Sequence, residues 1–163
     1  IGEFTPPDYL TEVKDGAFYG WPYVYFKDYA DPTQVQLNPD KVKQAKQTSL
    51  MPDLPLDAHS VPLGLLFHSG KNIDGKYKDG AFVVRRGGVS TSKLTGYDVL
   101  FIPFIDGKPT GIIETFLSGF IASEDRGEIF GRPVGIAETN NGEIIITDDV
   151  GGRLLMISPT ERE

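Results

Sequence analysis

The side chains best suited to bind a charged ligand in this chain are three arginines. Arg85 and Arg86 end an apolar run, and Arg132 directly precedes another. A guanidinium forms two parallel hydrogen bonds with a carboxylate or a phosphate, so clustered arginines favour an anionic ligand. The alternative is salt bridging within the protein, for which Asp148 and Asp149 provide carboxylates. The sequence leaves both interpretations open.

The chain has two histidines, and we expect them to have different roles. His68 follows a run in which Leu63, Leu65 and Phe67 alternate with other residues. Because successive side chains of a strand point to opposite faces, we expect His68 to lie on the other face, half exposed. His59 precedes the same run, in a loop that enters the strand. Ligand-binding residues often lie in such loops, so His59 is a candidate binding residue.

Other known reaction motifs are missing. Asp8, Glu12 and Asp15 offer oxygen ligands beside Gly16, but their spacing differs from that of the twelve-residue calcium loop, so the sequence leaves calcium binding open. The Gly87-Gly88 segment lacks the spacing of a phosphate-binding loop. We find no Ser/His/Asp set and no zinc motif. Since the chain has no cysteine, any redox chemistry requires a bound cofactor.

The composition narrows the class of protein. Acidic residues outnumber basic ones by 23 to 16, which argues against binding to nucleic acid or to an anionic membrane. The longest apolar run, residues 99–105, is far shorter than the roughly 18 residues of a membrane span. The 19 glycines and 12 prolines favour short strands joined by tight turns over a helix bundle.

The elements that would position these side chains form a repeat. Each unit is a series of short apolar strands separated by Gly, Asn or Asp turns, which is typical of a propeller blade. In this alignment Asp148 corresponds to Arg86, and both follow the second strand of their unit. Three segments recur in the same order: 62–67 as 133–138, 80–86 as 142–148, and 96–102 as 152–157.

We therefore predict an all-β fold in which the whole chain is one partial propeller domain. Residues 59–120 form one blade, and residues 131–163 form a final blade that lacks its outer strand. Residues 1–58 form a loop-rich segment with a short helix within 40–47 and an aromatic cluster, 18–26, expected in the core. Two blades cannot close a ring, so the chain is expected to be the C-terminal portion of a longer protein. A small β-sandwich is the alternative.

Several segments together resemble the C-terminal part of the glucose/sorbosone dehydrogenase family. The resemblance extends over the whole chain but over only the last third to half of a typical member. The segments that carry it are Pro7-Asp8-Tyr9-Leu10-Thr11, Asp15-Gly16-Ala17-Phe18-Tyr19-Gly20-Trp21-Pro22, Ala58-His59-Ser60-Val61-Pro62-Leu63-Gly64-Leu65, Thr95-Gly96-Tyr97, Asp106-Gly107-Lys108-Pro109, Gly131-Arg132-Pro133-Val134-Gly135 and Asp148-Asp149-Val150-Gly151.

The resemblance implies a six-bladed propeller that binds pyrroloquinoline quinone (PQQ) and calcium and oxidises a sugar or a related alcohol or aldehyde. It also implies a periplasmic or secreted protein. The family's general base is a histidine in the first half, outside this chain, so the other blades would be its partners. The resemblance places His59, Arg85, Arg86 and Arg132 on the cofactor side, and Asp8 and Tyr19 near the calcium loop.

One departure from the family supports an alternative function. Sorbosone-type members commonly continue the second strand as His-Gly-Ser-Trp-Asn-Arg, whereas residues 86–91 of this chain read Arg-Gly-Gly-Val-Ser-Thr. This loop would face the cofactor, so its change favours either a different substrate or a non-catalytic propeller module that binds carbohydrate or protein. In both cases, open blade edges predict either self-association or an unusual rearrangement of the chain.

Overall fold

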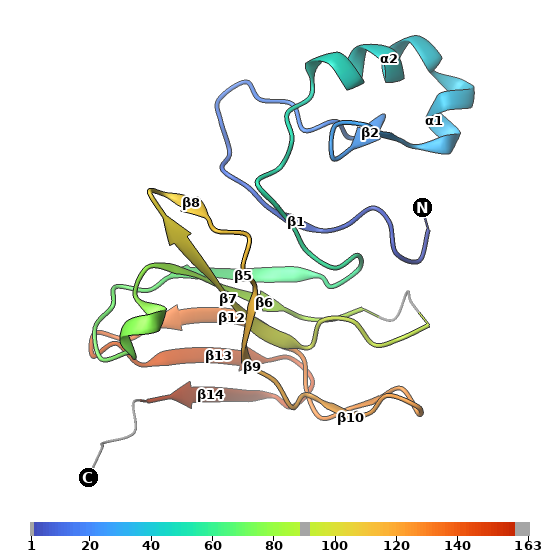
Figure 1. Ribbon diagram of the computed structural model, residues 1–163. Helices are drawn as coiled ribbons and strands as arrows, with labels where there is room; N and C mark the ends of the chain where they lie inside the picture. Colours follow the sequence, from blue (N-terminus) through green and yellow to red (C-terminus); the bar gives the residue numbers. More distant parts are fainter. Residues whose placement is uncertain (1, 89–91, 159–163) are drawn as a thin grey trace.

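Two antiparallel sheets form the body of the structure, a computed structural model that describes residues 2–88 and 92–158 (Figure 1). The first sheet follows chain order through four strands, and a short fifth strand, β8, pairs with the far end of β7. Its members are β5 (Pro62–Phe67), β6 (Gly80–Arg85), β7 (Asp98–Ile105), β8 (Lys108–Pro109) and β9 (Glu114–Leu117). A 3-10 helix, η1 (Gly75–Tyr77), lies between β5 and β6.

The second sheet has three strands in chain order, β12 (Pro133–Glu138), β13 (Ile144–Asp148) and β14 (Arg153–Ile157). Between the two sheets lies a hairpin of β10 (Ile121–Ser123) and β11 (Glu128–Ile129). The strands that the repeat predicts are thus present in both units.

The register corrects the alignment of the two units by one residue. Arg85 pairs with Pro62 in the first sheet, and Asp148 pairs with Pro133 in the second. Asp148 is therefore equivalent to Arg85, and Asp149 is equivalent to Arg86. The aligned glycines misled the comparison, because Gly80 begins a strand whereas Gly142 lies in a turn with a φ of +89°.

The sheets pack face to face through an apolar core. The face of β6 and β7 that carries Phe82, Val84 and Phe101 contacts Ile144 and Ile146 of β13, and all five side chains are buried. The inner strands β5 and β12 lie side by side at this junction (Figure 1). A Cβ on Gly64 of β5 would stand 2.8 Å from the carbonyl oxygen of Val134, so only glycine allows this approach.

The burial of β5 reverses our expectation for His68. Leu63, Leu65 and Phe67 are more than half exposed, whereas His68 is 6% exposed and on the side of the second sheet. Its Nδ1 accepts from the Gly70 amide at 3.0 Å, so Nε2 donates to the Gly142 carbonyl at 2.9 Å. His68 therefore joins the two sheets and is not a half-exposed strand residue.

Two apolar sheet faces remain open. One carries the three exposed side chains of β5, although Leu54 and Leu56 cover its neighbours Val83, Leu100 and Ile102. The other carries Leu154 and Met156 of β14, which are 72% and 64% exposed. The register makes these two residues equivalent to Val99 and Phe101, which are buried against the second sheet.

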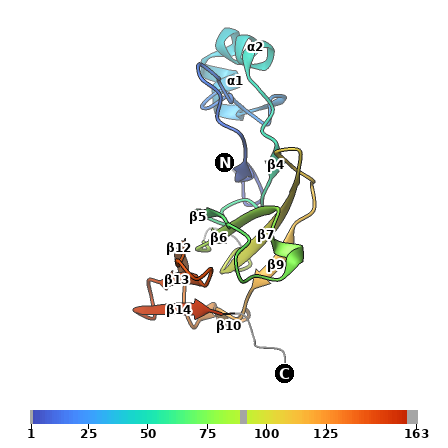
Figure 2. The ribbon, with the colours of Figure 1, turned by 90° about the vertical axis from the view of Figure 1, so that its left-hand side faces the viewer.

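Residues 2–61 form an extension whose helical part stands apart from the sheets, as both views show (Figures 1 and 2), whereas Leu54 and Leu56 pack on the first sheet. The predicted short helix is longer than expected, and a second helix precedes it. Asp31 caps the N-terminus of this preceding helix, because its side chain accepts hydrogen bonds from the amides of Thr33 and Gln34. The elements are β1 (Tyr9–Leu10), β2 (Val24–Tyr25), β3 (Tyr29–Ala30), α1 (Pro32–Leu37), α2 (Pro39–Thr48) and β4 (Leu54–Pro55).

The aromatic cluster of residues 18–26 is only partly in a core. Val24 packs against Val42 and Ala45 of α2, and Phe18 adds to this small cluster. Trp21, in contrast, is 69% exposed. Within the described residues, no helix is long and apolar enough to cross a membrane.

Candidate functional site

The candidate site lies where the inner strands β5 and β12 begin. At this end of the first sheet the Arg86 amide donates to the Val61 carbonyl at 2.9 Å. At the same end of the second sheet the Asp149 amide donates to the Arg132 carbonyl at 3.0 Å. Because these bonds are equivalent in the two units, the repeat itself brings Arg86, Arg132 and Asp149 to one end of the sheets.

Asp149 joins the two arginines across the junction of the sheets. Its Oδ2 accepts from Arg86 Nε and its Oδ1 accepts from Arg132 Nε, each at 2.9 Å. The three side chains are between 28% and 35% exposed, so a ligand can reach them. Two guanidinium groups share one carboxylate, which leaves one net positive charge. We call Arg86, Arg132 and Asp149 the arginine site.

Asp148 holds the turn that carries this site. Its side chain is fully buried and accepts from the amides of Arg132, Val150 and Gly151 and from the guanidinium of Arg153. Burial alone would raise the pKa of Asp148, but the hydrogen bonds from Gly151, Arg153 and Arg132 lower it to about 2. Asp148 is therefore a charged support of the site.

Glycine is required on both sides of Asp148. A Cβ on Gly131 or on Gly151 would lie 2.4 Å from the Asp148 Oδ2 atom. From the sequence, Asp148 and Asp149 are equal candidates for salt bridges, whereas the structure gives them different roles. A buried carboxylate needs small neighbours and backbone amides that donate to it. The sequence signal for Asp148 is therefore the pattern Gly131-Arg132…Asp148-Asp149-Val150-Gly151.

Arg85 is separated from the arginine site. It shares a face of β6 with buried Val83, and its guanidinium binds Asp98 at 2.7 and 2.6 Å and Asp57 at 2.5 Å. Burial alone would lower the pKa of Arg85, but Asp98 and Asp57 raise it above its ordinary value. The sequence left open an anionic ligand or a salt bridge within the protein. Arg85 forms salt bridges, so its role is structural.

His59 lies at the same end of the sheets as the arginine site. Its backbone is left-handed, with a φ of +59°, and its Nε2 lies 3.0 Å from the Gly2 carbonyl oxygen. A Cβ on Gly88 would lie 2.4 Å from the His59 carbonyl oxygen, so the segment after Arg86 packs against this loop. The part of the altered loop at residues 89–91 lies outside the described residues.

The two predicted calcium ligands have structural partners. Asp8 Oδ2 accepts from Ser60 Oγ and from the Val61 amide, each at 3.1 Å, and thereby fixes the loop before β5. The Tyr19 hydroxyl donates to the Glu12 carbonyl at 2.5 Å. Calcium takes about six to eight oxygen ligands. Among the residues that the structure describes, no group of three or more His, Asp or Glu side chains could hold a metal ion. Asp8 and Tyr19 are thus bonded within the chain, and the described side chains form no carboxylate cluster for calcium.

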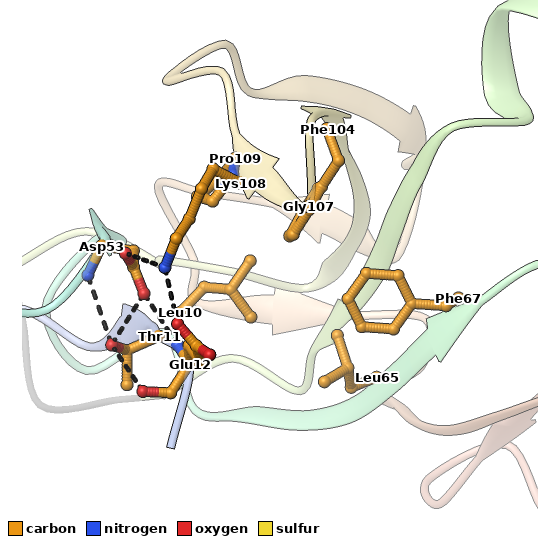
Figure 3. A pocket seen from close by; sticks show the side chains of 10 residues that line it. All are labelled: Leu10, Thr11, Glu12, Asp53, Leu65, Phe67, Phe104, Gly107, Lys108 and Pro109. Carbon is orange, nitrogen blue, oxygen red and sulfur yellow. Dashed lines mark hydrogen bonds and ion pairs between the residues drawn. The ribbon is translucent and has the colours of Figure 1, made fainter. Parts of the chain in front are cut away.

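A hollow of about 250 Å³ lies toward the opposite end of β5 (Figure 3). Leu65 and Phe67 of β5 form its apolar floor with Phe104, and the rings of Phe67 and Phe104 meet edge to face. Lys108 binds Glu12 at 2.7 Å and Asp53 at 3.3 Å across its rim. These bonds raise the pKa of Lys108. The hollow is thus apolar inside and closed on one side by an ion-pair network.

The fold matches solved structures at low sequence identity. An AA12-family carbohydrate-active enzyme of Trichoderma reesei superposes with a TM-score of 0.74 at 16% identity, covering 97% of this chain and 44% of that chain. The PQQ domain of pyranose dehydrogenase from Coprinopsis cinerea gives 0.64 at 18%, covering 87% and 40%. The soluble aldose sugar dehydrogenase of Escherichia coli gives 0.59 at 17%, covering 94% and 38%. These matches confirm the mostly-β, partial propeller fold and the resemblance to PQQ-type sugar dehydrogenases.

Sequence comparison defines the family. An uncharacterized protein of Borreliella burgdorferi is 32% identical over 163 residues, which cover 96% of this chain and 40% of that protein. The chain thus spans less than half the length of this relative and of the solved structures. The family model described as TrAA12-like matches residues 10–160. The chain therefore belongs to the TrAA12-like family.

Proposed function

We propose that this chain forms part of a PQQ-dependent sugar dehydrogenase and that the arginine site binds the carboxylates of the quinone. The observation that carries the proposal is the convergence of Arg86 and Arg132 on Asp149 from two sheets, with one net positive charge. A guanidinium is the side chain best matched to a carboxylate. The solved structures with this fold include a PQQ domain and an aldose sugar dehydrogenase.

Bound PQQ would supply the two-electron acceptor for the oxidation of a sugar alcohol to a carbonyl. The residues of this chain would bind and orient: Arg86 and Arg132 would hold the acidic edge of the cofactor. Asp149 accepts from both guanidinium groups and offsets one of their two charges. His59 borders the site through its loop. We assign the proton-abstracting base to none of the described residues, and the proposal includes no calcium bound by this chain. We also propose that the protein is exported to the periplasm or secreted.

The test is a titration of the chain with PQQ, in which calorimetry measures the dissociation constant. Loss of one charge-assisted contact costs about 1.5 to 3 kcal/mol, so Arg86→Met and Arg132→Met should each weaken binding by about 10- to 150-fold. Arg126→Met is the matched control, because Arg126 is 70% exposed and pairs with Glu128 in the β10–β11 hairpin. Affinities unchanged by both site variants would refute the proposal.

The alternative is a non-catalytic propeller module that binds carbohydrate or protein. The open face of β5 supports it, since Leu63, Leu65 and Phe67 are exposed together. The same titration separates the two functions. Saturable binding of PQQ that depends on Arg86 supports the dehydrogenase, whereas binding of a sugar or a protein without any PQQ affinity supports the module.

A further inference from the structure

Trp21, the only tryptophan of the chain, is held in an exposed position by a tight turn. The amides of Tyr23 and Val24 both donate to the Gly20 carbonyl at 2.9 Å. A Cβ on Gly20 would lie 2.6 Å from Val24, which is buried against α2, so the turn is anchored in a core. The exposed indole is therefore presented by rigid backbone and does not belong to a loose end of the chain.

The indole borders a hollow of about 250 Å³ with a mixed lining. Trp21, Pro22 and Tyr25 supply flat apolar surface, and the ring of Tyr25 is stacked on Tyr29 with centroids 5.6 Å apart. Thr5 and Asp31 also line the hollow, and each carries an oxygen that can accept a hydrogen bond. The side chain of Asp31 is held in place, because its Oδ1 accepts hydrogen bonds from the Thr33 and Gln34 amides at the start of α1.

This lining has the chemistry that recognises a neutral sugar ring. One face of a pyranose presents C–H groups that pack on an aromatic ring, while its hydroxyls need hydrogen-bond partners at the edge. The volume is somewhat below the roughly 300 to 1,000 Å³ of pockets for drug-sized ligands, which suits one ring. Among the described residues no Lys or Arg lines the hollow, so this lining offers no cation for an anionic ligand.

A chain of contacts joins the wall of the hollow to the end of the sheets that carries the arginine site. Gly2 lines the hollow, and its carbonyl oxygen lies 3.0 Å from His59 Nε2. Two residues after His59, Val61 accepts the hydrogen bond of the Arg86 amide. His59 thus links the wall of the hollow to the strand ends that hold Arg86.

We infer that the hollow beside Trp21 is a subsite for a pyranose, separate from the anion-binding arginines and connected to them through His59. The inference rests on the proposed function in one respect, because it assigns the sugar of that reaction to a place on this chain. Its recognition is by stacking on Trp21 and hydrogen bonding to Thr5 and Asp31, independent of any bound cofactor.

The test uses the chain without PQQ and titrates it with glucose. Since Trp21 is the single tryptophan, its fluorescence reports this hollow alone. We expect a saturable change in emission, and we expect sorbitol, an open-chain polyol without a ring face, to produce a smaller one. No change with glucose up to its solubility limit would overturn the inference.

Variants then locate the binding by calorimetry. Trp21→Ala and Thr5→Val should each weaken glucose binding, the first by about tenfold. Phe4→Ala is the matched control, because Phe4 is a 71% exposed aromatic residue in the same segment that does not line the hollow. Glucose affinity unchanged in Trp21→Ala would overturn the inference. Arg126→Met, in the β10–β11 hairpin, should leave glucose binding unchanged. Because this titration contains no PQQ, failure of the sugar subsite and failure of the PQQ site are read out separately.

Discussion

Replacement of Arg85 by methionine should destabilise the protein much more than replacement of its neighbour Arg86. Arg85 and Asp98 are 9% and 12% exposed and form two hydrogen bonds. Methionine fills a similar volume but leaves the Asp98 carboxylate without its counter-charge. The Arg86 pair with Asp149 is about one-third exposed, and Asp149 keeps Arg132 in the variant.

The magnitudes follow from burial. Removal of one partner from a buried ion pair costs about 3 to 5 kcal/mol, because the remaining charge is desolvated and unpaired. Asp57 is 66% exposed, so its bond to Arg85 adds less than about 1 kcal/mol. Arg86→Met removes a more exposed pair and should cost less than about 1 kcal/mol. The two neighbouring arginines should therefore differ by about 2 to 5 kcal/mol in their effect on the free energy of unfolding.

The assay is urea unfolding of the chain, with the midpoint and the slope both measured. The double variant Arg85→Met/Asp98→Leu is the internal control, because an apolar pair of similar volume can replace a buried ion pair at little cost. We expect it to be more stable than Arg85→Met alone. A loss of less than 1 kcal/mol in Arg85→Met, or equal losses at Arg85 and Arg86, would refute the structural role assigned to Arg85.

Three further predictions concern the turn, the junction and the open faces. Because the pKa of Asp148 falls from 3.8 to about 2 on folding, its stabilising effect is present above pH 3.8 and is lost as the pH falls toward 2. Asp148→Asn should flatten this acid limb of the stability curve, and an unchanged limb would contradict the assignment. Gly64→Ala should cost about 1 to 3 kcal/mol in urea unfolding, since its Cβ would meet the Val134 carbonyl at 2.8 Å; an alanine tolerated without loss would show that β5 and β12 are not in this contact. The open faces should make the chain self-associate in sedimentation velocity, and Met156→Glu should shift it toward monomer, whereas a wild-type chain that is monomeric at all concentrations would count against the prediction.

The strands of the repeat, β5 to β7 and β12 to β14, were predictable because they are largely apolar runs between glycine, asparagine or aspartate turns. Their exposed and buried faces were not. A blade packed between neighbours is apolar on both sides, so the alternation of Leu63, Leu65 and Phe67 did not indicate which face the second sheet covers. This ambiguity is why His68 was expected at the surface and is buried between the sheets instead.

The candidate site was predictable in part. The repeat located Arg86 and Arg132 at one end of the sheets, but two neighbours in sequence, Arg85 and Arg86, have opposite environments. Alternation along the strand carried that information, because Arg85 follows Val83 at the spacing of one face. The helix α1 was missed because its six residues have no apolar period, although Asp31 before a proline is a known start signal.

The most direct test of the account is the dissociation constant for PQQ across a series in which the net charge of the arginine site is raised and lowered. Asp149→Asn raises the net charge of the site by one, and Arg86→Met lowers it by one. If the arginines attract the carboxylates of the quinone, binding should be tightest in Asp149→Asn, intermediate in the wild-type chain and weakest in Arg86→Met. The same dissociation constant in all three proteins would contradict the central claim.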